Sequence, residues 1–220
     1  MKGGEEVSFS KSISLRVSIK LVQKKMIKEG NMKKLLLVSL LFVIVFGSST
    51  VFAVEKAPIG AGNLVLKVDY INFTDSAMDD LDVDSGLYVG LEAYSHLADT
   101  APNFYIGMEV GYANSDGEEE NFDTEVTYVP IELNLKYAMH ITPELVLDLG
   151  AGPSINYVKV DAGGSEDDWV WGGQVFADLN YKINQFFIGI NAKYQVTEDV
   201  DDSDVSLKNW RIGGQAGIMF

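Results

Sequence analysis

The chain has 220 residues, no cysteine and a formal net charge of −15. Without cysteine it can form neither a disulfide scaffold nor a cysteine-ligated zinc site. Its acidic balance disfavours nucleic acid as a partner, because phosphate binding requires a surplus of cations.

Residues 32–53 have the three parts of a secretory signal peptide. A basic start at residues 32–34 precedes an apolar run over residues 35–46, and small residues lead to Ala53. The run is too short for a membrane-spanning helix. We expect cleavage after Ala53, which leaves 8 basic and 29 acidic residues and a formal charge of −21. Residues 1–31 precede this complete signal, and we interpret them as an upstream mis-start or an extended basic n-region.

Residues 54–220, the expected mature chain, have the strand period of two throughout and no helical period of useful length. Eight segments alternate apolar residues with polar or small ones: 63–73, 87–95, 103–112, 126–137, 144–155, 169–181, 185–194 and 207–220. Eight segments of about ten residues match the smallest transmembrane β-barrels. Pro130 falls in the polar phase of the fourth segment. Because proline cannot donate to a strand ladder, we expect a bulge there.

The connections between these segments alternate in length. Short ones near 97–103, 138–143 and 183–184 alternate with longer ones near 74–86, 113–125, 156–168 and 196–206. The longer connections carry 20 of the 29 acidic residues of the mature chain. This asymmetry predicts short periplasmic turns at one end and long, acidic extracellular loops at the other.

The aromatic residues are sorted toward the two ends of the apolar rows. The outer ends carry Tyr70, Tyr112, Trp171, Tyr194 and Trp210, and the inner ends carry Phe104, Tyr137, Tyr181, Phe186 and Phe220. Two such girdles are typical of a membrane barrel. The alternative fold is a soluble lipocalin-like barrel whose apolar face points inward around a ligand. The polar phase favours the membrane barrel, because opposed charges and many glycines suit a narrow lumen better than a solvated face.

The last segment ends on the aromatic residue Phe220, and here the sequence resembles the small bacterial outer-membrane β-barrel proteins of the OmpA/OmpX-like family. Residues 129–137 also look like a strand common in that family. The resemblance covers residues 61–220 and implies an all-β, eight-stranded, antiparallel up-and-down transmembrane barrel. It further implies a monomer in outer-membrane lipid and lipopolysaccharide, inserted by a barrel-assembly machinery that recognises Phe220.

Ten charged residues share the polar phase of the predicted strands: Lys67, Asp69, Glu92, Glu109, Glu132, Lys136, Asp148, Asp178, Lys193 and Arg211. Eight strands enclose a space just wide enough for side chains to fill, and buried charges must be paired. We therefore interpret the ten as a salt-bridge network that closes the lumen, in a barrel with a structural or surface-interaction role. The alternative is a narrow, cation-preferring, porin-like channel, which the excess of six acids over four bases favours.

The sequence offers little for catalysis or metal binding. Its two histidines, His96 and His140, both lie beside predicted periplasmic turns, where they cannot join an outer-rim acid in a general-base pair or triad. We expect two solvated turn histidines and no enzyme activity or cofactor. Asp80, Asp82 and Asp84 resemble a calcium-binding loop weakly, because glycine comes one place late and leucine stands where glutamate is expected. Weak binding of Ca²⁺ or Mg²⁺ at these loops stays open.

Overall fold

The computed structural model describes residues 57–79, 83–98, 100–119, 122–161, 164–200 and 205–220. The predicted upstream stretch 1–31, the predicted signal peptide 32–53, Asp80 and Asp82 lie outside these ranges. Eight strands are described: β1 (Gly62–Phe73), β2 (Ser85–His96), β3 (Phe104–Glu119), β4 (Phe122–His140), β5 (Leu145–Asp161), β6 (Ser165–Ile183), β7 (Phe186–Thr197) and β8 (Asn209–Met219).

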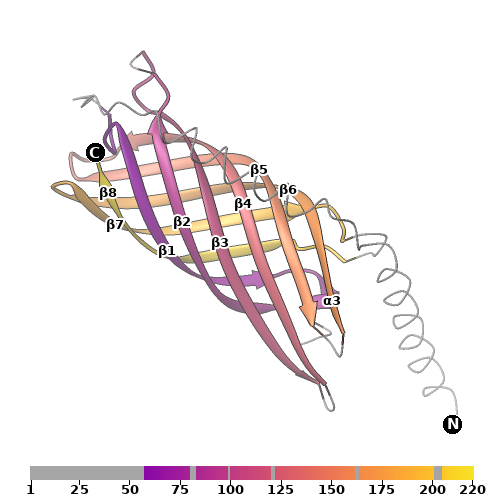
Figure 1. Cartoon of the computed structure of the whole chain (residues 1–220). Coiled ribbons are helices and arrows are strands. Elements are labelled where there is room, and N and C mark those ends of the chain that lie inside the picture. The colour runs from indigo at the N-terminus through magenta and orange to yellow at the C-terminus, as the bar shows by residue number, and fades with distance from the viewer. Residues whose placement is uncertain (1–56, 80–82, 99, 120–121, 162–163, 201–204) are drawn as a thin grey trace, which may run out of the picture. The chain divides into compact units, whose positions relative to one another are not determined.

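The strands form one closed barrel, in which each strand pairs antiparallel with the next and β8 pairs with β1 (Figure 1). The predicted eight-stranded up-and-down barrel is confirmed. We name its two ends by their contents. The inner mouth holds Phe220 and the short connections, and the outer mouth holds the one-turn helix α3 (Ser76–Asp79). No helix among the described residues is long and apolar enough to cross a membrane.

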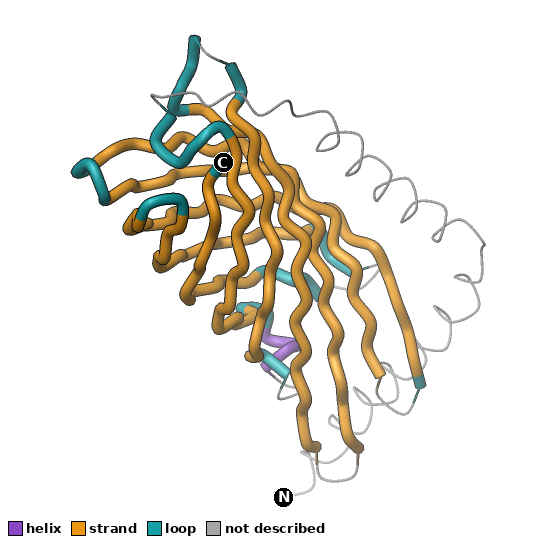
Figure 2. The backbone as a smooth tube through the Cα atoms, turned by 60° about the vertical axis from the view of Figure 1, so that its left-hand side comes forward, coloured by secondary structure: helices purple, strands orange, loops and turns teal. Residues whose placement is uncertain are grey.

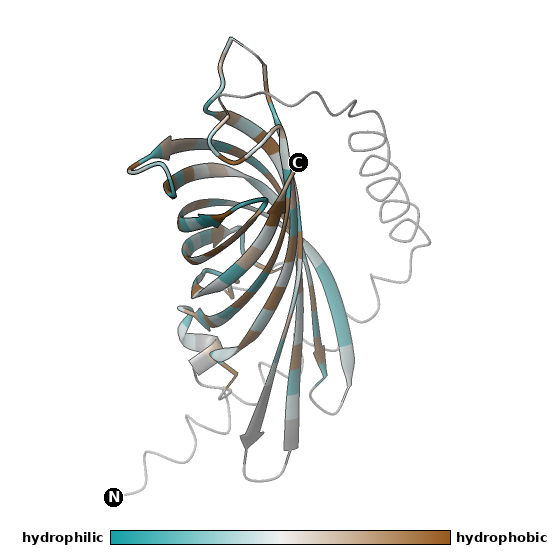
Figure 3. Cartoon of the chain, turned by 90° about the vertical axis from the view of Figure 1, so that its left-hand side faces the viewer, coloured by the Kyte–Doolittle hydropathy of each residue, from teal (hydrophilic) through white to brown (hydrophobic). Residues whose placement is uncertain are grey.

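Side chains alternate between the two faces of the wall as the sequence predicts. In β1, Leu66 and Tyr70 are about half exposed, whereas Lys67 between them is fully buried. Figure 3 shows the resulting hydrophobic and hydrophilic bands along the strands. The apolar rows therefore face outward and the charges face inward, so the lipocalin-like alternative is wrong. This arrangement buries the charges and presents hydrocarbon to lipid.

The aromatic girdle residues lie on the exposed face. All ten side chains are at least 38% exposed. Some of them pack in pairs across neighbouring strands. The rings of Tyr70 and Trp210 lie 5.5 Å apart at the outer level, and those of Phe104 and Tyr137 lie 4.9 Å apart at the inner level. Aromatic rings at these two heights suit the two membrane interfaces, where the polar groups of tyrosine and tryptophan reach the headgroups.

Four strands extend at least four residues farther at the outer end than predicted. β3 and β4 pair as far as Glu119 and Phe122, and β5 and β6 pair as far as Asp161 and Ser165. Their neighbours end earlier, since β2 pairs with β3 only to Asn114 and β7 pairs with β6 only to Gly172. A four-stranded sheet, which we call the protruding sheet, therefore extends beyond the rest of the outer mouth (Figure 2).

The prediction of long loops over 113–125 and 156–168 is wrong, because most of these residues lie in strands. The expected bulge at Pro130 is also wrong. Val110 pairs with Ile131 and Ala113 pairs with Tyr128 in one unbroken register, so no residue is inserted. The ladder with β3 instead leaves Val129 and Pro130 unpaired, which accommodates the missing N–H of the proline.

A charge placed on the lipid-facing row should destabilise the barrel. Ala216 lies on the exposed face of β8 between the two girdles. Ala216→Lys should lower the free energy of unfolding in lipid vesicles by about 2–4 kcal/mol, because lysine near the bilayer midplane is poorly solvated. Thr100→Lys, in an exposed connection at the inner mouth, should have little effect. Equal unfolding curves for the two variants would contradict the membrane orientation.

Candidate functional site

The ten charged residues of the predicted network all lie inside the barrel. Each is at most 4% exposed. They come from all eight strands, because each strand contributes at least one residue from its inward phase. The candidate functional site is therefore the barrel interior itself.

At its centre, like charges are neighbours along the wall and opposite charges face each other across the lumen. Glu109 and Glu132 are direct partners on β3 and β4, and Lys193 and Arg211 are direct partners on β7 and β8. Like charges in such positions repel. Both cations reach across the lumen, however. Lys193 Nζ lies 2.6 Å from Glu109 Oε2 and also contacts Glu132, and Arg211 pairs with Glu132.

The remaining charges extend this network toward the inner mouth. Lys67 pairs with Glu92 and lies 3.2 Å from Glu109. Lys136 bridges Glu92 at 3.2 Å and Asp148 at 3.5 Å. Each lysine therefore pairs with at least two carboxylates, so that four cations can pair with a larger number of acids.

Two acids have weaker charge partners. Asp178 lies directly opposite Asp148 on the neighbouring strand, and its closest described cation, Lys67, is 4.0 Å away. Asp69 accepts a 2.8 Å hydrogen bond from Asn191. The six acids and four bases of the network are therefore unequal in number because of acids such as Asp69 and Asp178, which have weaker charge partners than the central glutamates.

Polar and aromatic residues that the sequence analysis did not single out complete the interior. Gln195 links Tyr128 at 2.7 Å to Asn156 at 2.8 Å and accepts a 3.0 Å hydrogen bond from Arg211. Aromatic faces also cover two cations, since Lys136 Nζ lies 3.6 Å from the centre of the Tyr94 ring and Arg211 lies over Tyr88. The strand period could have identified these residues from the sequence, because they occupy the same inward-facing positions of their strands as the charged residues.

Interior glycines provide space for the aromatic rings. A Cβ atom at Gly150 would lie 2.1 Å from the Phe176 ring, and one at Gly217 would lie 2.3 Å from the Phe187 ring. Each glycine is the direct cross-strand partner of the aromatic residue. Some of the glycines of the polar phase are thus places where an aromatic ring occupies the space that a side chain would take.

An apolar layer lies at each mouth. The outer layer is built from strand residues and from the segments that cover the mouth, and its buried members include Phe73, Met78, Val83, Tyr128, Val158 and Leu207. The inner layer includes Ile59, Tyr94, Tyr105, Ala138, Val146 and Phe176. The charge network is therefore enclosed between two hydrophobic layers.

The other predicted site residues lie apart from this network. His140 is exposed as expected, but His96 is half-buried. The His96 ring packs 5.7 Å from Tyr105, and its Nε2 makes no hydrogen bond with any described residue. The expectation of a solvated His96 is wrong, because its strand phase turns it inward. Asp84 accepts a 3.1 Å hydrogen bond from Asn72, and the described residues contain no group of three or more potential metal ligands.

The comparisons with known proteins agree with this architecture. A family model for the outer membrane protein beta-barrel domain matches residues 38–213. No curated protein matches the chain. Among solved structures, Neisserial surface protein A is 15% identical, covers 73% of this chain and 97% of its own, and has a TM-score of 0.55. The attachment invasion locus protein Ail of Yersinia pestis is 15% identical, with coverage of 71% and 97% and a TM-score of 0.48. At these identities the likeness concerns the fold alone.

Removing one cation from the centre should cost far more than removing one at the surface. Arg211→Met leaves Glu132 buried with one cation fewer, so we expect a loss of about 3–5 kcal/mol in the free energy of unfolding. Lys159→Met, which breaks an exposed pair with Asp161, should change unfolding little. Urea unfolding of the refolded proteins in lipid vesicles measures both. Adding Glu132→Gln to Arg211→Met should recover part of the loss, and similar losses in both single variants would contradict the network.

Proposed function

The chain belongs to the outer membrane protein beta-barrel family, and on that premise we propose that it is a closed, non-conducting barrel with a structural or surface-interaction role. It lies in the outer membrane, with its apolar rows in lipid. The observation that carries the proposal is the filled lumen, in which a buried charge network lies between two apolar layers.

A filled lumen opposes ion passage in two ways. An ion that entered from either mouth would first have to displace mainly hydrocarbon side chains, among which tyrosine hydroxyls are the side-chain oxygen atoms of the two layers. It would then have to compete for carboxylates that already bind lysine or arginine, and breaking a buried pair leaves a charge uncompensated. The surplus of acids at Asp69 and Asp178 favours the alternative, a narrow cation-preferring channel, but these residues lie between the same two layers.

The surface-interaction part of the proposal concerns the protruding sheet. Its outward face carries Tyr157 and Trp169, whose rings pack 5.3 Å apart, together with the exposed acids Glu125 and Asp167. Aromatic rings above the outer girdle suit the headgroup region of the membrane. Acids at this height suit divalent cations that bridge to lipopolysaccharide phosphates, because calcium and magnesium prefer oxygen ligands.

The same proposal includes assembly as a monomer by the barrel-assembly machinery through Phe220. Its ring is half exposed on the lipid-facing side of the wall, at the inner mouth. Its backbone N and O each pair with Gly62 at 2.9 Å, which joins β8 to β1. Deleting Phe220 would therefore remove both a surface ring and the last pairing of the closing seam.

Planar-bilayer recording tests the closed lumen. The refolded mature protein should give no steady current above that of the same protein after heat denaturation, because the described side chains of the lumen are buried between two apolar layers. Folding should be verified in the same sample by the shift in gel mobility on heating. Stable, cation-selective current steps from folded protein would overturn the proposal and establish the porin-like alternative.

Divalent cations should protect the acidic outer end. We expect magnesium or calcium at about millimolar concentration to slow protease cleavage of the two hairpins of the protruding sheet, β3–β4 and β5–β6. Sodium chloride should substitute only in part, because it screens exposed charges over a Debye length of about 8 Å at physiological ionic strength. Changing Asp80, Asp82 and Asp84 to Asn should leave the protection intact if many acids bind the ions loosely, and should abolish it if these three form a specific site. If adding magnesium or calcium leaves the cleavage rate unchanged, the proposed binding of divalent cations is wrong.

A further inference from the structure

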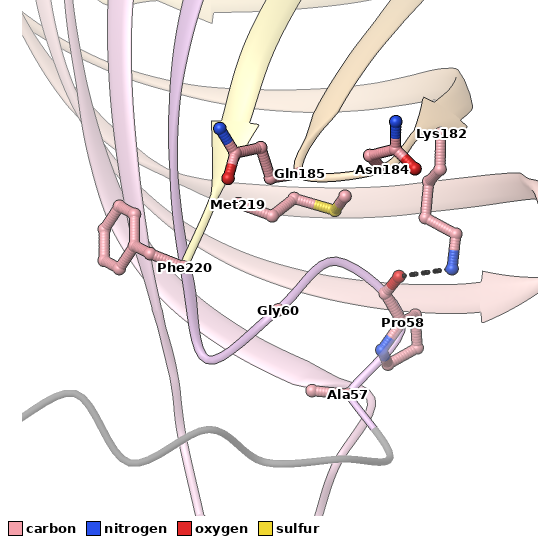
Figure 4. A pocket seen from close by; sticks show the side chains of 8 residues that line it. All are labelled: Ala57, Pro58, Gly60, Lys182, Asn184, Gln185, Met219 and Phe220. Atoms are coloured by element: carbon pink, nitrogen blue, oxygen red, sulfur yellow. Dashed lines mark hydrogen bonds between the residues drawn. The ribbon is translucent and has the colours of Figure 1, made fainter.

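Residues 57–60 form a short segment, which we call the N-terminal strap, that lies at the inner mouth before β1 begins (Figure 4). It belongs to no strand. Together with Lys182, Asn184, Gln185, Met219 and Phe220 it lines a pocket of about 240 Å³ at the rim. The strap is therefore attached to the barrel wall without being part of it.

The strap is anchored by buried side chains and by three hydrogen bonds with the barrel wall. Pro58 is buried, and Ala57 packs against the inner apolar layer. Ile59 is fully buried in the inner apolar layer. The hydroxyl of Tyr105, on β3, accepts a 3.2 Å hydrogen bond from Ile59 N and donates a 2.9 Å bond to Gly60 O. Lys182, near the end of β6, donates a 3.1 Å bond to Pro58 O, which is the dashed line in Figure 4.

A glycine turn joins the strap to the wall. Gly60 has φ = 78°, a conformation that residues with a side chain rarely adopt. A Cβ at this position would also lie 3.0 Å from the carbonyl oxygen of Phe220. Two residues later, Gly62 pairs with Phe220 in both directions. The turn therefore lets the chain leave the β1–β8 seam and cross the mouth.

We propose that the strap is a removable seal of the inner mouth, with Ile59 as the residue that closes it. Its release would break three hydrogen bonds and expose the buried side chains of Pro58 and Ile59, while every strand pairing of the barrel stays intact. Such a segment opens at lower free energy than the wall. Release would admit water to the inner apolar layer and to His96, whose buried Nε2 has no described hydrogen-bond partner, while the outer layer stays closed.

Cysteine accessibility tests the seal, because the chain has no cysteine of its own. Val146→Cys places a thiol in the inner layer, and Val158→Cys places one in the outer layer on the same strand, β5. Both valines are buried, so a small water-soluble maleimide should react slowly with each in the full mature chain folded in lipid vesicles. Combining Val146→Cys with Ile59→Ser or Tyr105→Phe should raise its labelling rate by about tenfold or more.

A matched control in the outer layer distinguishes release of the strap from loosening of the whole barrel. Val158→Cys should keep its slow labelling when Ile59→Ser or Tyr105→Phe is added, because the outer layer does not contact the strap. Unchanged labelling of Val146→Cys in folded protein would overturn the seal, and an equal rise at Val158→Cys would show general loosening instead. Tyr105→Phe keeps the ring and serves if Ile59→Ser fails to fold. This readout is water access to one layer, so it does not depend on whether the barrel conducts.

Discussion

The structure depends on one constraint: a charge inside a narrow lumen has no water to solvate it and must find its partner on another strand. In this barrel the central partners are on opposite walls. The pairs that Lys193 and Arg211 form with Glu109 and Glu132 join residues 61 to 84 positions apart in sequence. An open sheet of the same strands would set Glu109 beside Glu132 with neither cation in reach. These four central charges are paired together, and only when the wall closes.

The rest of the interior follows from this constraint. Desolvated ion pairs gain from a dry environment only when their remaining polar groups are also bonded. Amides such as Gln195 and Asn156 fill that role beside the charges, and the apolar layers at the two mouths keep bulk water away from both. Glycines then set how closely the aromatic rings approach the wall. Charge pairing, layer composition and glycine placement are therefore three aspects of one packing problem.

Periodicity predicted the parts of this barrel that repeat. The inward phase of all ten charged residues and the outward phase of the girdles follow from the strand period, because a one-residue slip would put every charge in lipid. The ends of β3 to β6 were missed, since beyond the membrane the outward residues no longer need to be apolar and the alternation fades. The strap was missed for a related reason. Four residues without a period give no signal, and Ile59 is informative only once Tyr105 and Lys182 are seen around it.

The unequal strand lengths make the outer end lopsided. β3 to β6 are consecutive in the wall, so the extra height of the protruding sheet lies on one flank and the flank formed by β7, β8, β1 and β2 stays low. The outer end of the barrel is consequently asymmetric about the barrel axis, with one high flank and one low flank. A neighbour that diffuses laterally meets a tall wall with exposed acids and the Tyr157–Trp169 ring pair from one direction, and an aromatic girdle close to the rim from the other. Lateral encounters should therefore depend on the rotational orientation of each barrel about its own axis.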